Sequence, residues 1–209
     1  GSYSESCAKK MYPDCETVSC KTFDECFEKA SQDNSMRSII PESNKTTGNI
    51  GIEYLIFKFR LNIYAEHFYK ISHNLLGLKG TKIKDIKDVY SHAQALSQSS
   101  IFIKKNNLTE QVRADTAGSA KFVSETKDKT KAAIASNLSA EIYDLEIIDE
   151  DIQDDKENFT RFLLMGKEII QPENKNNLYI TSFLFKLKSK PAALYSALQG
   201  MAINGVNMI

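Results

Sequence analysis

The feature that most constrains the fold is a repeated order of short apolar strands and helices between residues 82 and 143. Strands are predicted at 89–91, 110–113 and 132–135, and helices follow at 93–105, 117–125 and 138–143. Strands that alternate with helices in this way are typical of a mainly parallel sheet covered by helices. We therefore predict an α/β domain in this part of the chain.

Each of these strands is followed by a hydroxyl side chain close to the start of its helix: Ser91, Thr116 and Ser136. In open α/β sheets the carboxyl ends of the strands form the ligand crevice, because helix N-termini there offer unpaired N–H groups and the positive end of the helix dipole. This arrangement predicts an anionic ligand. The alternative is that each hydroxyl is an ordinary N-cap.

The charge balance limits the class of partner. The chain has 27 basic and 27 acidic residues, so its formal net charge is zero. This gives no electrostatic reason to expect nucleic acid or an anionic membrane as a partner, and we expect a small ligand instead. No apolar run approaches the roughly 18 residues that a membrane span requires.

The cysteines indicate the redox state. All four, Cys7, Cys15, Cys20 and Cys26, lie within the first 26 residues, without a CxxC pair and without a nearby histidine. We therefore expect reduced structural thiols in a cytoplasmic protein rather than a metal site or disulfides.

The remaining segments give a coarse secondary structure. Helices are predicted from residue 4, from the capping box TFDE at 22–25, over 50–59 and from Pro191. Strands are predicted at 16–20, 36–40, 62–68, 71–78 and 178–187, with a further one opening at 205. A polar loop is expected at 42–47, and the acidic run at 149–157 is expected to be a solvated connection.

Residues 158–162, NFTRF, predict a strand that continues to residue 165. Side chains alternate along a strand, so Thr160 and Phe162 should face one way and Arg161 the other. A hydroxyl between two aromatic rings is a proton donor in a dry place. The alternative is that Thr160 is present only as a good strand former.

Taken together, the motifs resemble those of prephenate dehydratase, in the same order along the chain. They are GSYSE at 1–5, ISHNLL at 71–76, SHAQALSQ at 91–98, ADTAGSAK at 114–121, AAIAS at 132–136 and NFTRF at 158–162. The resemblance covers essentially residues 1–166. The segment from Thr181 through PAAL at 191–194 to Asn207 resembles the first half of an ACT regulatory domain.

The resemblance implies a two-lobed α/β catalytic domain similar to periplasmic-binding-protein type II lobes. Lobe 1 would comprise residues 1–70 and 155–167, and lobe 2 would comprise 71–154. A linker at 168–177 would lead to an incomplete ACT domain, ferredoxin-like α+β, at 178–209. A homodimer or homotetramer is expected.

The implied reaction is the decarboxylating dehydration of prephenate to phenylpyruvate in phenylalanine biosynthesis, which needs no cofactor because aromatisation of the ring drives it. By motif, Thr160 would hydrogen-bond the leaving hydroxyl. Threonine is a very weak acid, so it would act through position in a dry site. Ser91, Gln98 and Asn44 match the other expected catalytic positions.

The resemblance also implies a set of substrate-binding residues: Thr116, Ala117, Ser136, Arg161, Phe162, Ser2 and Tyr3. His73 and His92 are expected to be structural. Two alternatives are open. One is arogenate dehydratase, whose substrate differs by an amino group, and the other is a non-catalytic small-carboxylate-binding protein of the same fold.

The chain departs from the family pattern at several positions. Residues 41–45 read PESNK where the family usually reads Pro-Ile-Glu-Asn-Ser, and Lys45 is expected either to contact a carboxylate or to point to solvent. Ala93 replaces a usual proline and Ala192 a usual glycine. The family's first strand would precede Gly1, and its Glu-Ser-Arg-Pro segment would follow Ile209. We therefore expect an excerpt of a longer protein or a shortened protein. Phenylalanine at the ACT domain is a possible partner of the family that these departures put in doubt for this chain.

Overall fold

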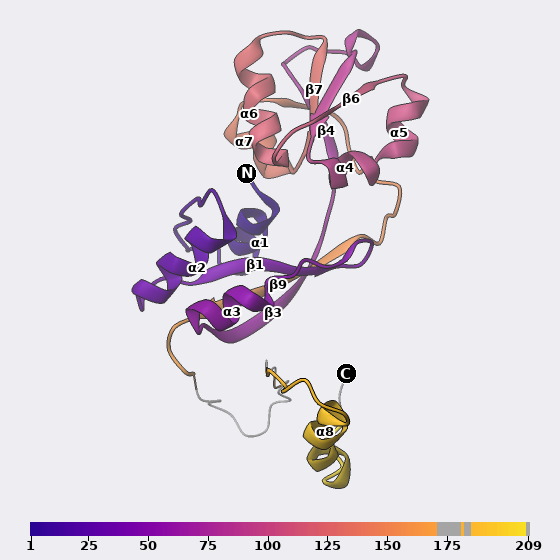
Figure 1. Cartoon of the computed structure of the whole chain (residues 1–209). Coiled ribbons are helices and arrows are strands. Elements are labelled where there is room, and N and C mark those ends of the chain that lie inside the picture. The colour runs from indigo at the N-terminus through magenta and orange to yellow at the C-terminus, as the bar shows by residue number, and fades with distance from the viewer. Residues whose placement is uncertain (171–180, 182–184, 208–209) are drawn as a thin grey trace. The chain divides into compact units, whose positions relative to one another are not determined.

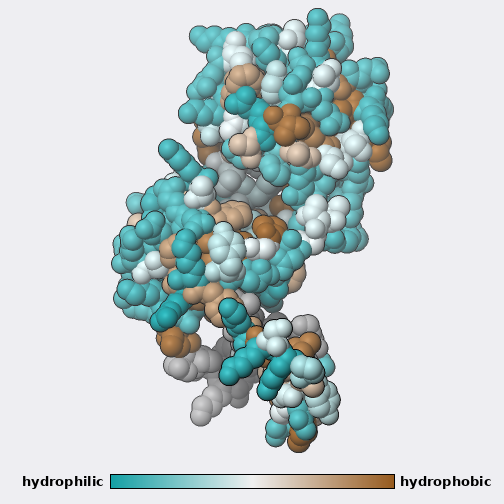
Figure 2. All heavy atoms as spheres, in the orientation of Figure 1, coloured by the Kyte–Doolittle hydropathy of each residue, from teal (hydrophilic) through white to brown (hydrophobic). Residues whose placement is uncertain are grey.

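The computed structural model describes residues 1–170, 181 and 185–207 (Figure 1). The chain divides into two compact units, Gly1–Gln171 and Pro172–Ile209. The first unit has a mixed α/β fold built on two sheets, and each sheet has its own hydrophobic core. Figure 2 shows that the visible surface of this unit is largely hydrophilic, with small apolar groups between the polar ones.

The first sheet is antiparallel and has the strand order β2-β1-β9-β3. Its strands are β1 (Ser38–Asn44), β2 (Gly48–Asn49), β3 (Asn62–Lys70) and β9 (Phe159–Gly166), and the helices α1 (Tyr3–Met11), α2 (Phe23–Gln32) and α3 (Glu53–Phe59) pack with them. We call this group lobe 1. Leu163 and Met165 face the core with α2 and α3, whereas Phe162 packs with Cys7 of α1. Alternation along β9 thus supplies both faces of the sheet.

The second sheet is mixed: the three strands at 88–91, 109–112 and 131–135 are parallel, as the strand and helix rhythm predicts, and the other two pairings are antiparallel. Its order is β6-β5-β7-β4-β8, with β5 parallel to β6 and β7, and β4 antiparallel to β7 and β8. The strands are β4 (Asn74–Gly77), β5 (Asp88–Ser91), β6 (Thr109–Val112), β7 (Lys131–Ala135) and β8 (Glu146–Asp149). The helical elements are η1 (Ile83–Asp85), α4 (Ala93–Ser97), α5 (Ser100–Lys105), α6 (Thr116–Thr126) and α7 (Asn137–Ile142). We call this group lobe 2.

In the first unit, one predicted strand is absent and one predicted loop is shorter than expected. Residues 16–20 form no strand, because Val18 is 60% exposed and the segment has no apolar face to bury. The loop predicted at 42–47 is shorter: β1 runs on to Asn44, with a register irregularity against β9 between Pro41 and Ser43, and only residues 45–47 form a turn before β2. That extension carries Asn44 into the sheet directly opposite Thr160.

Some of the predicted N-cap residues are the observed ones. Thr22 Oγ1 accepts a hydrogen bond from the Glu25 N–H at 3.1 Å and caps α2, as the capping box predicts. Ser136 caps α7 in the same way. Ser91 and Thr116 are not caps, because His92 and Asp115 occupy the N-cap positions of α4 and α6.

In the second unit, α8 (Ala193–Ile203) follows Pro191 and confirms the predicted helix. Residues 205–207 are not a strand. The predicted strand at 178–187 falls largely outside the described residues, and its described C-terminal part, 185–187, has no regular structure. Across residues 1–170, 181 and 185–207, no helix has the length and apolarity needed to cross a membrane.

Phe162 offers a direct test of the lobe 1 core. The Phe162 side chain is 1% exposed, whereas Phe68 on the neighbouring strand β3 is 67% exposed. Phe162→Ala should lower the free energy of unfolding by about 3–5 kcal/mol. The matched control Phe68→Ala should change it by less than about 1 kcal/mol. Urea denaturation of the two variants measures this difference, and equal effects would contradict the assigned core.

Candidate active site

Thr160 lies near the start of β9, an inner strand of the lobe 1 sheet. Its neighbours across the sheet are Asn44 on β1 and Tyr69 on β3. Directly paired residues of antiparallel strands project from the same face, so these three side chains form a row. The Thr160 side chain is nearly buried, with 6% of the residue exposed, and its Oγ1 accepts a hydrogen bond from Asn44 Nδ2 at 2.8 Å.

Three side-chain amides close a ring next to Thr160. Asn44 Nδ2 donates to Asn158 Oδ1 at 2.8 Å, and Asn158 Nδ2 donates to Gln98 Oε1 at 3.1 Å. Gln98 Nε2 returns to Asn44 Oδ1 at 3.3 Å. Gln98 is the C-cap residue of α4 in lobe 2, whereas Asn44 belongs to β1 in lobe 1. The ring therefore joins the two lobes at the position of Thr160.

The Asn44 side chain is held from a second direction. Its Oδ1 accepts from the Thr46 and Thr47 backbone N–H groups at 3.0 and 3.3 Å. Gln94 of α4 then donates from Nε2 to Thr47 Oγ1 at 2.8 Å, which is a further link between the lobes. With both ends of its amide engaged, Asn44 has a fixed orientation toward Thr160.

A buried histidine extends the network away from Thr160. His73 Nε2 lies 2.9 Å from Gln98 Oε1, and His73 Nδ1 lies 2.6 Å from the Tyr3 hydroxyl, which also donates to the Ser72 carbonyl at 2.9 Å. Gln98 Oε1 can only accept, so the His73 proton is on Nε2 and Nδ1 is an acceptor, which shares the single Tyr3 proton with the Ser72 carbonyl. Burial lowers the pKa of His73, and the bond to Gln98 only partly offsets it. Burial also raises the pKa of Tyr3, with a smaller contribution from Tyr69. Both groups are neutral near pH 7.

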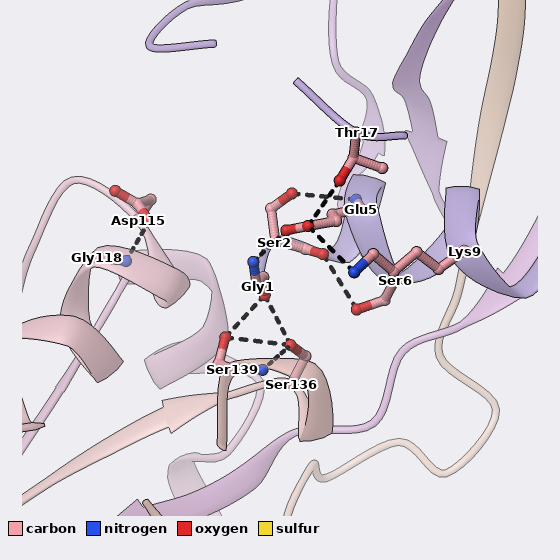
Figure 3. Close-up of polar contacts among 10 residues, drawn as sticks. All are labelled: Gly1, Ser2, Glu5, Ser6, Lys9, Thr17, Asp115, Gly118, Ser136 and Ser139. Carbon is pink, nitrogen blue, oxygen red and sulfur yellow. Dashed lines mark hydrogen bonds and ion pairs between the residues drawn. The ribbon is translucent and has the colours of Figure 1, made fainter. Parts of the chain in front are cut away.

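Three predicted site residues lie apart from this network. Ser91 is buried and donates to the Ile134 carbonyl at 2.6 Å inside lobe 2. Thr116 is the first residue of α6, which Asp115 caps through Gly118 N–H at 2.6 Å (Figure 3). Ser136 donates to the Gly1 carbonyl at 2.7 Å (Figure 3). Of the predicted catalytic residues, the structure brings together Asn44, Gln98 and Thr160 but not Ser91.

The predicted substrate contacts divide in a similar way. Arg161 faces away from Thr160, and its guanidinium binds Glu66 Oε2 at 2.7 Å and Glu42 Oε2 at 3.3 Å. Two carboxylates neutralise this cation, so a direct role in binding an anionic substrate conflicts with its contacts. Phe162 is part of the core instead.

At the helix starts, Ser2 caps α1 by accepting from the Glu5 N–H at 3.2 Å. Ala117 is half-buried in the first turn of α6. Tyr3 is the predicted substrate contact that joins the hydrogen-bond network.

Sequence reasoning missed Asn158 and gave His73 only a structural role. Both residues lie in motifs that carry the family resemblance, NFTRF and ISHNLL. The sequence therefore contained a signal for them, but it did not show which side chains they would contact. The other open question concerned Lys45. Its side chain is half-exposed, and its ammonium pairs with two carboxylates of the protein itself, Asp155 at 3.5 Å and Glu157 at 3.3 Å.

The chemistry of the site is that of hydrogen bonds. Among the described residues, no group of three or more His, Cys, Asp or Glu side chains is placed to hold a metal ion. All four cysteines, which lie in the described part of the chain, are free thiols. The arrangement can position a hydroxyl and orient polar groups of a small ligand beside it.

A family of known proteins matches the part of the chain that contains this hydrogen-bond network. The family model for prephenate dehydratase matches residues 1–170, which include every residue of the network. The chain belongs to the prephenate dehydratase family. The resemblance of the sequence motifs is thereby confirmed.

Individual relatives agree with the family. The chain is 37% identical to prephenate dehydratase from Methanocaldococcus jannaschii over 215 residues, which covers 100% of this chain and 77% of that protein. It is 40% identical to arogenate dehydratase 2 from Petunia hybrida over 209 residues, covering 100% of this chain and 53% of the petunia protein. The chain thus spans about half the length of the plant relatives it matches.

The fold is shared with a solved structure. A prephenate dehydratase from Arthrobacter aurescens, in complex with L-Phe, matches with a TM-score of 0.83 over 98% of this chain and 70% of that chain. The sequence identity is 22%, so this likeness supports the fold alone.

His73 predicts a pH dependence of stability. Burial lowers the pKa of His73 in the folded protein below its usual value of about 6.5. Just below pH 6.5, the unfolded chain therefore binds a proton at this histidine that the folded protein does not bind. Stability is fully present above that pH and falls below it, toward the folded-state pKa, by up to about 1.4 kcal/mol per pH unit. Urea titrations between pH 7.5 and 5 should show this slope in the parent and in the exposed-histidine control His92→Gln, but not in His73→Gln. An unchanged slope in His73→Gln would contradict the assignment.

Proposed function

We propose that the protein catalyses the decarboxylating dehydration of prephenate to phenylpyruvate, a carbon-oxygen lyase reaction of phenylalanine biosynthesis. The proposal extends the family membership of residues 1–170 to an activity. Prephenate would be the substrate, and no cofactor would be required.

The observation that carries the proposal is the hydrogen bond between Asn44 and Thr160. Asn44 Nδ2 donates to Thr160 Oγ1, so the oxygen is already engaged as an acceptor. Within the described residues, Thr160 Oγ1 donates to no protein acceptor. The threonine proton is therefore free to be donated to a bound ligand.

This geometry suits a hydroxide leaving group. The ring hydroxyl of prephenate must leave as aromatisation proceeds, and a donor in a nearly buried position stabilises the developing negative charge more than water does. Asn44, Asn158 and Gln98 hold the threonine in place, and their neutral amides do not compete with it for a proton. Position rather than acidity would supply the catalysis.

We propose that Ser91, which the sequence motifs indicated as catalytic, is a positioning residue. Its hydroxyl is bonded within lobe 2 at the carboxyl end of β5, one residue before the His92 cap of α4. Ser91 would therefore act by fixing the start of the helix that carries Gln98. Ser136, Thr116 and Ala117 would act through the helix starts at which they lie.

Several finer features belong to the same proposal. We propose that Gly1–Gln171 corresponds to a two-lobed catalytic domain of the periplasmic-binding-protein type II kind, with the lobe boundaries at 70–71 and 154–155. Residues 178–209 would be the first part of an ACT domain, supported by α8 after Pro191. The protein would be a homodimer or homotetramer in the cytoplasm.

A specific observation favours arogenate as a second candidate substrate. The petunia relative, 40% identical, is named an arogenate dehydratase. Arogenate carries an amino group where prephenate carries a keto group, and the ring chemistry is the same. Thr160 would then have the same role with either substrate.

A turnover assay of the protein tests the proposal. Purified protein should convert prephenate to phenylpyruvate, followed by the absorbance of the product in alkali, and arogenate should be assayed in parallel for phenylalanine. Turnover of neither substrate by folded protein would overturn the proposed activity. Ligand binding without turnover would instead identify a small-carboxylate-binding protein.

Thr160 should be the residue on which the rate depends. Thr160→Ala removes the proton donor while leaving the sheet intact, so kcat should fall by about 10²–10³-fold with less than about a threefold change in KM. Thr160→Ser keeps the hydroxyl and should retain most of the rate. Equal activity of the alanine variant and the parent would show that the chemistry lies elsewhere.

A further inference from the structure

A second group of polar residues surrounds a hollow of ≈ 220 Å³ beside α1. Its walls come from α1, from the end of β3 and the segment that follows it, and from the start of α7. They are formed by Tyr3, Ser6, Lys9, Tyr69, Lys70, Ser72, Ser136, Asn137, Leu138 and Glu141. The volume lies below the range of small-molecule sites, which run from roughly 300 Å³ upward, and favours a compact ligand or one part of a larger ligand.

This hollow adjoins the candidate active site. Tyr69 is the direct neighbour of Thr160 across the β3–β9 pair, and paired residues have Cβ atoms about 4.5–5.5 Å apart. Tyr3, on the opposite wall, bonds His73 and so connects to Gln98. A ligand in the hollow would have one wall within a single strand spacing of the Thr160 hydroxyl.

The wall of the hollow contains two basic side chains, Lys9 and Lys70. Lys70 forms no ion pair with any residue in the described part of the chain. Lys9 reaches only Glu5, at 3.9 Å, and Figure 3 shows its ammonium turned back along α1 toward that residue. Glu5 also accepts from Thr17 at 2.9 Å. The wall thus carries two lysines and one acidic side chain, Glu141, and two further carboxylates lie next to it. Glu5 pairs with Lys9, and Asp151 accepts from Ser72 Oγ at 2.6 Å and lies close enough to Lys70 for that lysine to lower its pKa.

A second hollow, of ≈ 410 Å³, lies on the Gln98 and Asn158 side of the network and has the opposite character. Its walls carry Asp154 and Asp155 and no basic side chain. Lys45 pairs with Asp155 at 3.5 Å and partly offsets this negative charge, but the wall itself has no lysine, whereas the wall of the hollow beside α1 has two. Burial raises the pKa of Tyr69, so this residue presents an uncharged phenol there rather than a repelling phenolate.

We propose that the hollow beside α1 receives a carboxylate of the substrate, and that Lys9 and Lys70 are the residues that favour the keto-acid dianion over its amino-acid analogue. This inference rests on the proposed function, because it assigns a binding role in the same reaction. The lysines attract both carboxylates of prephenate, and they repel the ammonium that arogenate adds. The discrimination is electrostatic and weakens with salt.

Binding to a variant that does not turn over separates recognition from catalysis. Prephenate and arogenate are titrated calorimetrically into Thr160→Ala at low and at high salt. Lys9→Gln and Lys70→Gln, each added to that background, should weaken prephenate binding by about five- to tenfold and weaken arogenate binding less. Glu141→Gln, a change of opposite sign in the same wall, should strengthen prephenate binding.

The matched control is Lys87→Gln. Lys87 is exposed just before β5, at the amino end of a strand whose carboxyl end leads to α4, so this variant changes net charge equally without touching the hollow. The proposal is overturned if either lysine variant binds prephenate as the background does, if Lys87→Gln weakens binding equally, or if arogenate loses as much affinity as prephenate.

A second measurement makes the test independent of the Thr160→Ala background. The same lysine variants are made in the parent, where KM for prephenate should rise about five- to tenfold with little change in kcat. If the parent shows no turnover, the proposed function fails, but its direct affinity for prephenate still decides whether the lysines form a carboxylate subsite.

Discussion

The ring of hydrogen bonds among Asn44, Asn158 and Gln98 is the interaction on which the site depends. It takes one side chain from the end of β1, one from the segment before β9, and one from the end of α4. Side-chain amides are suited to this position because each is both donor and acceptor and carries no charge to be desolvated. Loss of any one of them would leave buried partners unsatisfied, so the three act as a unit.

Side chains alternate along β9, so the two faces of the sheet carry residues with different roles. Thr160 and Phe162 project toward α1, with Thr160 joined to the amide ring and Phe162 to the core. Arg161 projects to the other side, where Glu42 and Glu66 balance its charge. One strand thereby places a neutral donor in a dry position and a paired cation where it does not disturb that donor's surroundings. A shift of one residue in register would exchange these roles.

Much of the fold could be predicted from the sequence, because the spacing of apolar residues that distinguishes strands from helices is a local property of the chain. The strand and helix rhythm predicted the three parallel strands of lobe 2, and the pattern at 158–165 predicted β9 and the direction of Thr160. The motifs gave Asn44, Gln98 and Thr160. The partners were not readable: Ser91 resembled a cap or a ligand group, but its hydroxyl is satisfied by Ile134. Arg161 was predicted to contact the anionic substrate, but its guanidinium binds Glu42 and Glu66. Such pairings join residues far apart in the chain and leave no local pattern.

The chain path of Gly1–Gln171 bears on how the protein is made. Lobe 2 is inserted between β3 and β9, so it is continuous in sequence, whereas the lobe 1 sheet receives its central strand only at Phe159–Gly166. During synthesis, β1 and β3 leave the ribosome without the strand that joins them, and lobe 2 can assemble first from nearer contacts. Until β9 arrives, two strand edges of lobe 1 are unpaired and open to wrong partners. The strand that carries the candidate catalytic threonine is thus also the strand that completes the fold.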